Sequence, residues 1–160
     1  MPRNDDSAGL NPSLLDRLID ADSAGTAWRR GYGVEQMTAA VLRDLEDLLN
    51  TRQSHQGLPA DFVQLHRSVF AYGLPELTSL DSITSQQRKE IGRVIEAVIT
   101  LHEPRLRDVR ATLLDEGEAK DRTVRFRIDA RLCLEPAPDV AFDTVLELAT
   151  GHYTVQPSGA

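Results

Sequence analysis

The segment RTVRFRIDARLCLE, residues 122–135, alternates apolar and polar side chains almost without fault. A period of two predicts a β-strand with one buried face and one face in water. We therefore expect Phe126 and Ile128 to lie in a core between a sheet and helices. The apolar face consists of Val124, Phe126, Ile128, Ala130, Leu132 and Leu134, and the polar face of Arg125, Arg127, Asp129 and Arg131.

Three other segments have a similar strand-like character. They are RDVRATLL at 107–114, VAFDTVLEL at 140–148 and HYTVQ at 152–156. Polar or proline-containing turns separate the strands, namely DEGEAKD, PAP and the turn at Thr150-Gly151. Short strands in close succession favour an antiparallel sheet.

Two long helices are expected before the sheet. The first runs from Val34 to about Arg52, and the second begins at Thr84, which has capping-box spacing to Gln87, and ends before Pro104. Helices first and strands second predict an α+β fold, with N-terminal helices packed on a mainly antiparallel sheet formed largely by the C-terminal half. The expected buried stripes are Val34, Met37, Val41, Leu45, Leu48 and Leu49 in the first helix and Ile91, Val94, Ile95, Val98 and Leu101 in the second.

A chain of 160 residues is long enough for one domain with a real core. We expect a disordered tail at residues 1–12, a single domain at 13–156 and a second tail at 157–160. A short helix in NPSLLDRLID is expected to follow the first tail, with Asn11 or Ser13 as its cap.

Charge and cysteine content exclude several functions. The net charge of -7 and the pI of about 5.0 make the chain a poor general binder of nucleic acid or anionic membrane. No apolar run approaches the length of a membrane span, and no export signal is expected. Cys133 has no second cysteine to pair with, which fits a reducing cytoplasm. The four scattered histidines predict no metal site, and no cofactor is expected.

Two acidic residues have a spacing known from enzymes. Glu35 and Asp44 reproduce the Glu-x8-Asp spacing of phage-type lysozymes. Within one helix, however, nine residues advance about 13.5 Å and rotate about 180°, so the two carboxyls should point apart. We therefore interpret them as solvated helix charges.

Glu103 is the other candidate acid. A general acid needs a partner carboxylate, and the sequence offers Asp108 or Asp81 without choosing between them. The structural alternative is that Glu103 and Arg105 flank a helix-to-strand corner at Pro104 and pair there. Charged residues beside a helix-ending proline are expected near the surface, where losing the pair should cost about 0–1 kcal/mol.

The arginine face of 125–131 could suggest an acidic ligand or RNA. Asp143 and Glu147 on the next strand can pair with these arginines, and no aromatic side chains interleave to stack bases. We therefore expect structural pairing first and protein-partner binding second. Cys133 has no histidine nearby in sequence that would mark it as a nucleophile.

Several segments, in this order, resemble TssE, the small baseplate subunit of the type VI secretion system, which is similar to the lysozyme-related baseplate-wedge proteins of contractile-tailed phages. The shared order and spacing of these segments carry the resemblance, since each alone is weak. His102 departs from it, because an aromatic residue is expected there. The segments are DLEDLLNTR (44–52), YGLPELTSL (72–80), HEPRL (102–106), RFRIDARL (125–132), EPAP (135–138), and FDTVLEL followed by TGHY.

The resemblance implies a structural protein rather than an enzyme. It implies a cytoplasmic place at the inner-membrane-docked baseplate, beside TssF, TssG and TssK, and contact with the first sheath ring of TssB and TssC. It also implies a partner-binding role for Glu103, Pro104 and Arg105, and a sheet that accepts strands from neighbours. The alternative is a peptidoglycan-cleaving, lysozyme-like enzyme, which would need export.

Overall fold

The computed structural model describes residues 13–19, 32–54, 57–76, 84–114, 123–133 and 138–159. The expected tail at 1–12, the turn at 115–121 and Leu134 lie outside these residues. Contacts divide the chain into two units, residues 1–41 and 42–160. The sheet, helix α4 and the charged residues discussed below all belong to the second unit.

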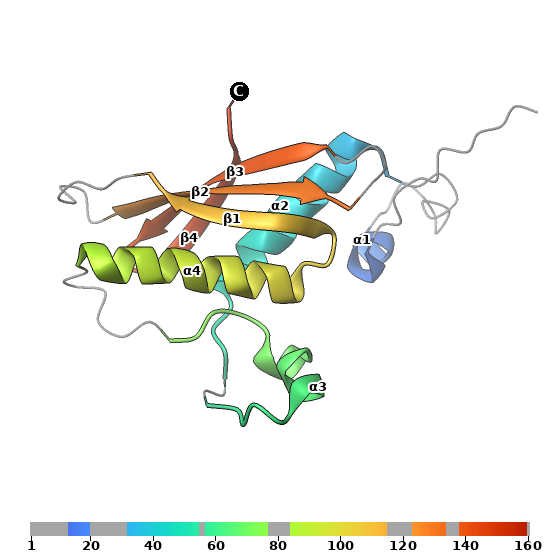
Figure 1. Ribbon diagram of the computed structural model, residues 1–160. Helices are drawn as coiled ribbons and strands as arrows, with labels where there is room; N and C mark the ends of the chain where they lie inside the picture. The colour runs from blue at the N-terminus through green and yellow to red at the C-terminus, as the bar shows by residue number, and fades with distance from the viewer. Residues whose placement is uncertain are drawn as a thin grey trace, which may run out of the picture. The chain divides into compact units, whose positions relative to one another are not determined.

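The second unit is built around a four-stranded antiparallel sheet in the order β1-β2-β3-β4 (Figure 1). The α+β prediction is therefore confirmed. The register places Phe126 opposite Thr144 and Ile128 opposite Phe142, so that equivalent faces of β2 and β3 coincide. The strands are β1 (Leu106–Leu113), β2 (Thr123–Leu132), β3 (Asp139–Glu147) and β4 (His152–Pro157).

One face of the sheet is buried, as the alternation in β2 predicts. Phe126 and Ile128 are both inaccessible to solvent. Helix α4 (Ser85–His102) covers this face, and at Gly92 an added Cβ would lie 3.5 Å from the Phe126 ring. An added Cβ would make an ordinary van der Waals contact there, which places the helix directly against the ring of Phe126. The remaining buried side chains of the sheet are Leu106, Val109, Val124, Ala130, Leu132, Phe142, Thr144, Leu146, Tyr153 and Val155.

Helix α4 begins and ends where the sequence predicts. Thr84 and Gln87 form a reciprocal capping box, and Glu103 is the C-cap before Pro104. The predicted buried stripe is wrong at two positions, because Leu101 is exposed and Val94 is only half-buried. At about 100° per residue, the buried positions 91, 95, 98 and 99 centre about 105° from Leu101. Ile99, which is fully buried, completes the stripe.

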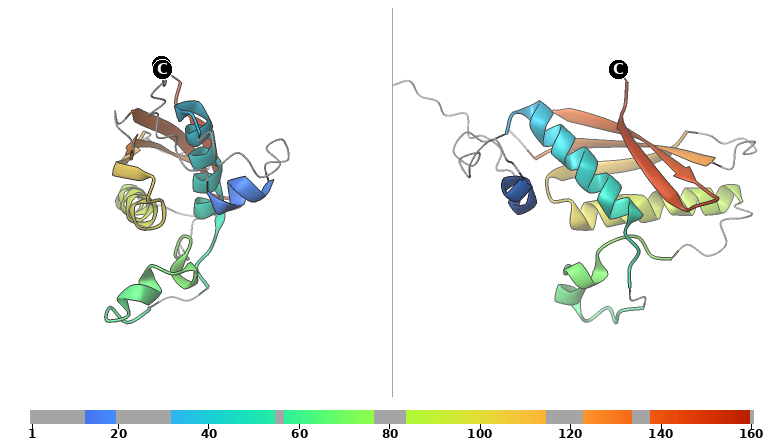
Figure 2. Two further views of the ribbon diagram at one scale, coloured as in Figure 1. Left: turned by 90° about the vertical axis from the view of Figure 1, so that its right-hand side faces the viewer. Right: turned by 180° about the vertical axis from the view of Figure 1, so that it is seen from behind.

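Helix α2 (Val34–Asn50) ends two residues before the predicted limit. Its apolar stripe is buried as predicted, except at Val34, which is exposed in the first turn. Figure 2 shows this helix in cyan to teal. Its C-terminal part, residues 42–50, belongs to the second unit. The buried residues of the stripe are Met37, Val41, Leu45, Leu48 and Leu49.

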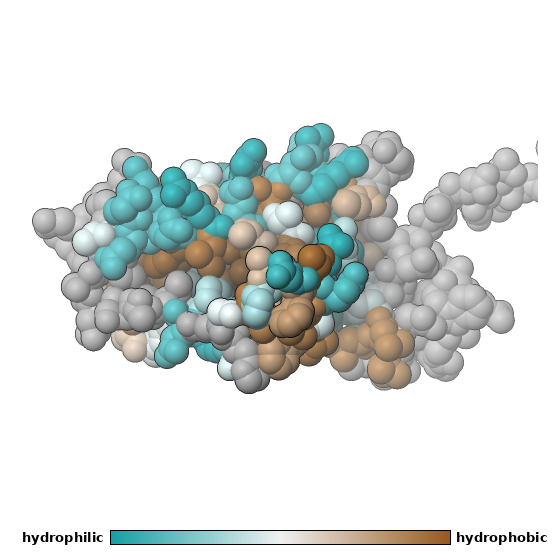
Figure 3. All heavy atoms as spheres, turned by 60° about the horizontal axis from the view of Figure 1, so that its bottom comes forward, coloured by the Kyte–Doolittle hydropathy of each residue, from teal (hydrophilic) through white to brown (hydrophobic). Residues whose placement is uncertain are grey.

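The segment between α2 and α4 buries few of its described side chains. It contains α3 (Val63–His66) and a 3-10 helix, η2 (Val69–Ala71). An open pocket of about 610 Å³ is lined by residues 61–65 and Ser68. Figure 3, in which this segment is turned towards the reader, shows apolar side chains gathered here. The exposed ones are Phe62, Val63, Val69, which is 90% exposed, and Phe70.

The first unit contains helix α1 (Leu14–Ile19). Ser13 is its cap, because the Ser13 hydroxyl accepts from the Asp16 N–H while the Asp16 carboxylate accepts from the Ser13 N–H. This selects Ser13 from the two predicted caps, Asn11 being outside the described residues. Across the described ranges, none of the helices has the length and apolar character required to cross a bilayer.

Candidate functional site

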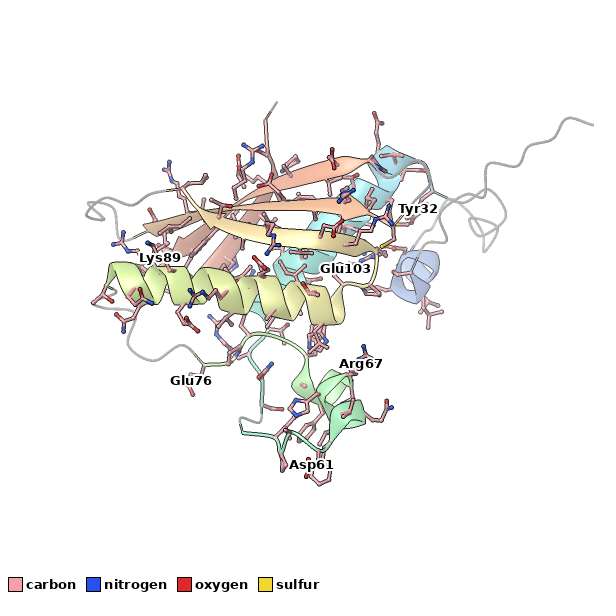
Figure 4. All side chains as sticks on the ribbon, in the orientation of Figure 1. Tyr32, Asp61, Arg67, Glu76, Lys89 and Glu103 are labelled. Atoms are coloured by element: carbon pink, nitrogen blue, oxygen red, sulfur yellow. The ribbon has the colours of Figure 1, made fainter. Side chains whose placement is uncertain are left out.

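The chain turns from α4 into β1 at Glu103-Pro104-Arg105 (Figure 4). Arg105 Nε donates to Glu103 Oε1 at 2.7 Å, and Arg105 Nη2 contacts Glu103 Oε2. The backbone N–H of Arg105 also donates to Glu103 Oε1, at 3.1 Å. The carboxylate therefore binds both the side chain and the backbone two residues later, which fixes the geometry of the corner.

A third residue joins this pair from a distant part of the chain. Arg105 Nη2 donates to Asp44 Oδ2 of α2 at 2.6 Å. The other oxygen of Asp44 accepts from Arg43 Nε at 3.1 Å and from Arg43 Nη2 at 2.7 Å. We call Asp44, Glu103 and Arg105 the charged corner. It links the C-terminal half of α2 to the corner at which the chain passes from α4 into β1.

The charged corner is more buried than its sequence position suggests. Glu103 is only 4% exposed, which contradicts the expectation that it lies near the surface. The reason is that Arg105 folds back over it and supplies three hydrogen bonds. Pro104, by contrast, is exposed, and Arg105 is partly exposed. The triplet thus has an internal acid and an external face.

Electrostatics keep Arg105 charged. Burial by itself would lower the pKa of Arg105, but the hydrogen bonds and charges of Glu103 and Asp44 outweigh it and raise that pKa. A guanidinium flanked by two carboxylates is compensated without any ligand. The arrangement is that of an ion-paired structural link, in which both acids are already hydrogen-bonded to arginine.

Tyr72 forms one wall of the charged corner. Burial raises the pKa of the Tyr72 hydroxyl, and the negative charges of Asp44, Asp47 and Glu103 raise it further. The ring of His102 meets Tyr72 edge-on, with centroids 5.4 Å apart, and His102 Nε2 lies 3.0 Å from the Ala71 carbonyl oxygen. His102 thereby fills the aromatic position at which the sequence departs from the TssE pattern.

Behind this wall, the segment after α2 runs against residues 71–74. The Leu74 N–H donates to the Thr51 carbonyl at 2.8 Å, and the Gln53 N–H donates to the Leu74 carbonyl at 2.9 Å. Gly73 has a φ of +102°, and a Cβ there would lie 2.5 Å from the Thr51 oxygen. Glycine is therefore required by conformation and by space. Three motifs that carry the resemblance, around Asp44, Tyr72 and Glu103, meet in this one region.

Among the described residues, three of the acids suggested for catalysis, Asp44, Glu103 and Asp108, are each ion-paired with an arginine. Asp108, one suggested partner of Glu103, pairs with Arg131 at 2.7 Å, and Asp81 lies outside the described residues. Asp108 also has a positive φ of 55° at an irregularity in the register of β1 and β2. Glu35 and Asp44 lie in one continuous helix, and Asp44 is bound by arginine.

The arginine face of β2 is engaged in charge pairs within the protein. The register places Arg127 opposite Asp143, one of the two acids expected to pair with the arginines, but it places the other, Glu147, opposite Thr123. The ion pair of Arg127, however, is with Asp129 on its own strand, at 3.1 Å. Cys133 follows β2 as an exposed free cysteine. Among the described residues, no group of three or more histidine, cysteine or acidic side chains is placed to hold a metal ion.

Sequence reasoning missed two polar residues that join α2 to β4. The Asn50 amide accepts from the Tyr153 N–H at 2.9 Å and donates to the Tyr153 carbonyl at 2.8 Å. Arg52 Nη2 donates to the Gly151 carbonyl at 2.6 Å. Both residues belong to the DLEDLLNTR motif, and TGHY supplies their partners. The joint occurrence of these two motifs in the sequence was the signal that could have indicated this contact.

Comparison with known families follows the same motifs. The family described as baseplate wedge protein gp25 matches residues 35–137, which include the charged corner, α4, β1 and β2. The chain belongs to this family. The baseplate-wedge resemblance read from the sequence is thus confirmed.

Two other comparisons add little. A search of curated proteins finds no match. Among solved structures, a chain of "The baseplate complex from the type VI secretion system" is similar, with a TM-score of 0.44 and 19% identity, over 69% of this chain and 94% of that chain.

Proposed function

We propose that this gp25-family protein is a non-enzymatic, TssE-like subunit of a type VI secretion baseplate that links the wedge to the first ring of the contractile sheath and helps sheath polymerisation to begin. One observation carries the proposal. The acids Asp44 and Glu103, which lie in the family-matched region, are both bound by Arg105 and join three structural elements. In this arrangement the two acids stabilise the fold by binding Arg105.

The arrangement also argues against the lysozyme-like alternative. A glycosidase needs one carboxylic acid that can release a proton and a second carboxylate facing it across the substrate. Both acids at the corner are instead held by one guanidinium, with Arg105 Nε 2.7 Å from Glu103 Oε1 and Arg105 Nη2 2.6 Å from Asp44 Oδ2. The chemistry therefore favours a structural role over hydrolysis.

The proposed partners are the wedge proteins TssF, TssG and TssK and the sheath proteins TssB and TssC, at a cytoplasmic, inner-membrane-docked baseplate. The surface of the segment between α2 and α4 supports a place in an assembly. Phe62, Val63 and Val69 are all more than half exposed there. Large apolar side chains gathered on a surface are typical of proteins that work with partners.

Within the triplet, we propose that Pro104 and Arg105 meet the partner while Glu103 holds them in place. Pro104 is exposed and Arg105 is partly exposed, whereas Glu103 is buried beneath them. The open antiparallel sheet supports the second part of the role, because an edge strand can accept a strand from a sheath subunit.

Complementation in the bacterium that encodes the protein tests this function. Deleting the gene should abolish the assembly of fluorescently labelled sheaths, and the wild-type gene should restore it. Glu35→Gln should restore it equally well, and purified wild-type protein should leave peptidoglycan intact. Sheaths that still assemble after the deletion, or peptidoglycan cleavage that Glu35→Gln removes from a folded protein, would overturn the proposal.

A further inference from the structure

The two edges of the sheet are not equally open. On β1, the Ala111 N–H donates to Glu96 Oε2 of α4 at 3.2 Å, and Gly92 of the same helix approaches the Ala111 carbonyl. Helix α4 thus occupies the β1 edge with a side chain and with its own backbone. An extended chain cannot pair there without displacing the helix.

On β4, the residues that face outward can be identified from the ladder. In an antiparallel ladder, every second pair of opposite residues exchanges backbone hydrogen bonds. The residues of the other pairs direct their N–H and carbonyl groups away from the partner strand. Ser158 N donates to the Ala141 carbonyl at 2.9 Å, which continues the pairing of β3 with β4. Residues 152, 154 and 156 therefore bond to β3, and Tyr153, Val155 and Pro157 direct their backbone groups to the free edge.

The first part of this edge is closed by the end of α2. The Asn50 amide makes both hydrogen bonds with Tyr153 that a neighbouring strand would make. Arg52 binds the Gly151 carbonyl beside it. Asn50 is itself held by the Glu46 carbonyl, which accepts from Asn50 Nδ2 at 2.9 Å. The side chain therefore acts as a fixed mimic of a strand.

The second part of the edge is open. Throughout the part of the chain that the structure describes, no hydrogen bond occupies the outward N–H and carbonyl of Val155. Pro157 follows and offers a carbonyl but no N–H. An added strand can therefore exchange two hydrogen bonds with Val155 and donate one more to Pro157.

We propose that residues 155–157 of β4 are the strand-acceptor site of this sheet, and that Asn50 and Arg52 set the point at which an incoming strand must stop. The partner is an extended segment. Its residue opposite Val155 shares the buried face of the sheet and should be apolar, because cross-strand neighbours project to the same side. This inference rests on the proposed function for one point only, namely that the incoming strand belongs to a sheath subunit.

Amide hydrogen exchange of the free protein, followed by NMR, tests the edge itself. The Val155 amide should exchange at least about tenfold faster than the Tyr153 amide, although both side chains are buried. Asn50→Ala should raise Tyr153 exchange about tenfold, whereas Asn50→Asp, which keeps the accepting oxygen, should not. Slow exchange at Val155, or Tyr153 exchange unchanged in Asn50→Ala, overturns the proposal.

Sheath assembly in cells tests the acceptor. Val155→Pro removes the outward N–H and spares the ladder to β3, while Val155→Ala shortens the same buried side chain and keeps the N–H. We expect Val155→Ala to support assembly and Val155→Pro to reduce it more than tenfold, with both proteins folded. Equal behaviour of the two variants overturns the acceptor site. Assembly without the gene would instead refute the proposed function, and the exchange results would be unaffected.

Discussion

Arg105 at the start of the sheet donates to Asp44 of α2 at 2.6 Å, although 61 residues separate them in the sequence. The same guanidinium binds Glu103. One side chain thus ties α2 to the corner between α4 and β1. The two carboxylates share one cation, so the loss of any member leaves the others with fewer partners.

Glu103→Ala should destabilise the protein by about 2–3 kcal/mol, because Arg105 keeps only one carboxylate and its backbone N–H loses its acceptor, Glu103 Oε1. This is more than the 0–1 kcal/mol that an exposed pair would give. Urea unfolding followed by circular dichroism measures the free energy. Glu90→Ala is a matched control, since Glu90 pairs with Arg93 on the surface and its loss should cost less than about 0.5 kcal/mol. Equal costs for the two variants would refute the buried link.

Phe126→Ala should lower the free energy of unfolding by about 3–5 kcal/mol, because the ring is fully buried between β2 and α4. Leu101→Ala is the comparison. Leu101 is exposed, so its truncation should cost less than about 1 kcal/mol. Denaturant titrations of both variants give the two values. A larger loss for Leu101→Ala would restore the buried stripe that the sequence predicts for α4.

Local signals in the sequence were sufficient to predict secondary-structure elements such as β2 and α4. The alternation around Phe126 predicts which face of β2 is buried, and Thr84 with Gln87 predicts the start of α4. Pro104 predicts its end, since proline disfavours helical geometry in the preceding residue. The prediction was wrong at Leu101 because the apolar residues of this helix are compatible with more than one buried stripe. The stripe that includes Ile99, and not Leu101, is the one that is buried.

The charged corner could be predicted only in part. The pairing of Glu103 with Arg105 is local, and the sequence offered it as one alternative. The third member, Asp44, is distant in sequence and has no periodic relation to the corner, so its contact with Arg105 could not be predicted. The Asn50 contact with Tyr153 is equally long-range, and only the fold shows that an amide can substitute for a strand.

Gly73→Ala should destabilise the protein by more than about 2 kcal/mol, because it combines a strained positive φ with a Cβ 2.5 Å from the Thr51 oxygen. Gly57→Ala separates the two causes. Gly57 also has a positive φ, +73°, but an added Cβ meets nothing within 4 Å, so only the conformational cost of about 1–2 kcal/mol applies. Thermal melting compares them, and a smaller effect at Gly73 than at Gly57 would contradict the close approach.

His102 should make the stability depend on pH in mildly acidic solution. Burial lowers the pKa of His102 below its ordinary 6.5, and the hydrogen bond to the Ala71 carbonyl only partly offsets this. The unfolded chain therefore binds a proton at a pH where the folded chain does not. The stabilising contribution is complete above pH 6.5 and is lost as the pH falls through the lower pKa of the folded state.

The free energy of unfolding, measured by urea titration from about pH 7.5 to about pH 5, should fall more steeply for the wild type than for His102→Phe. Phenylalanine keeps a ring against Tyr72 but cannot titrate, so it removes only the histidine's share of the slope. His152→Gln is the control, because it removes an exposed histidine of β4 and leaves the contact between His102 and Tyr72 in place. NMR titration of the ring protons gives the pKa directly. If the wild type and His102→Phe lose stability in parallel, the neutral His102 contributes nothing specific to the wall of the charged corner.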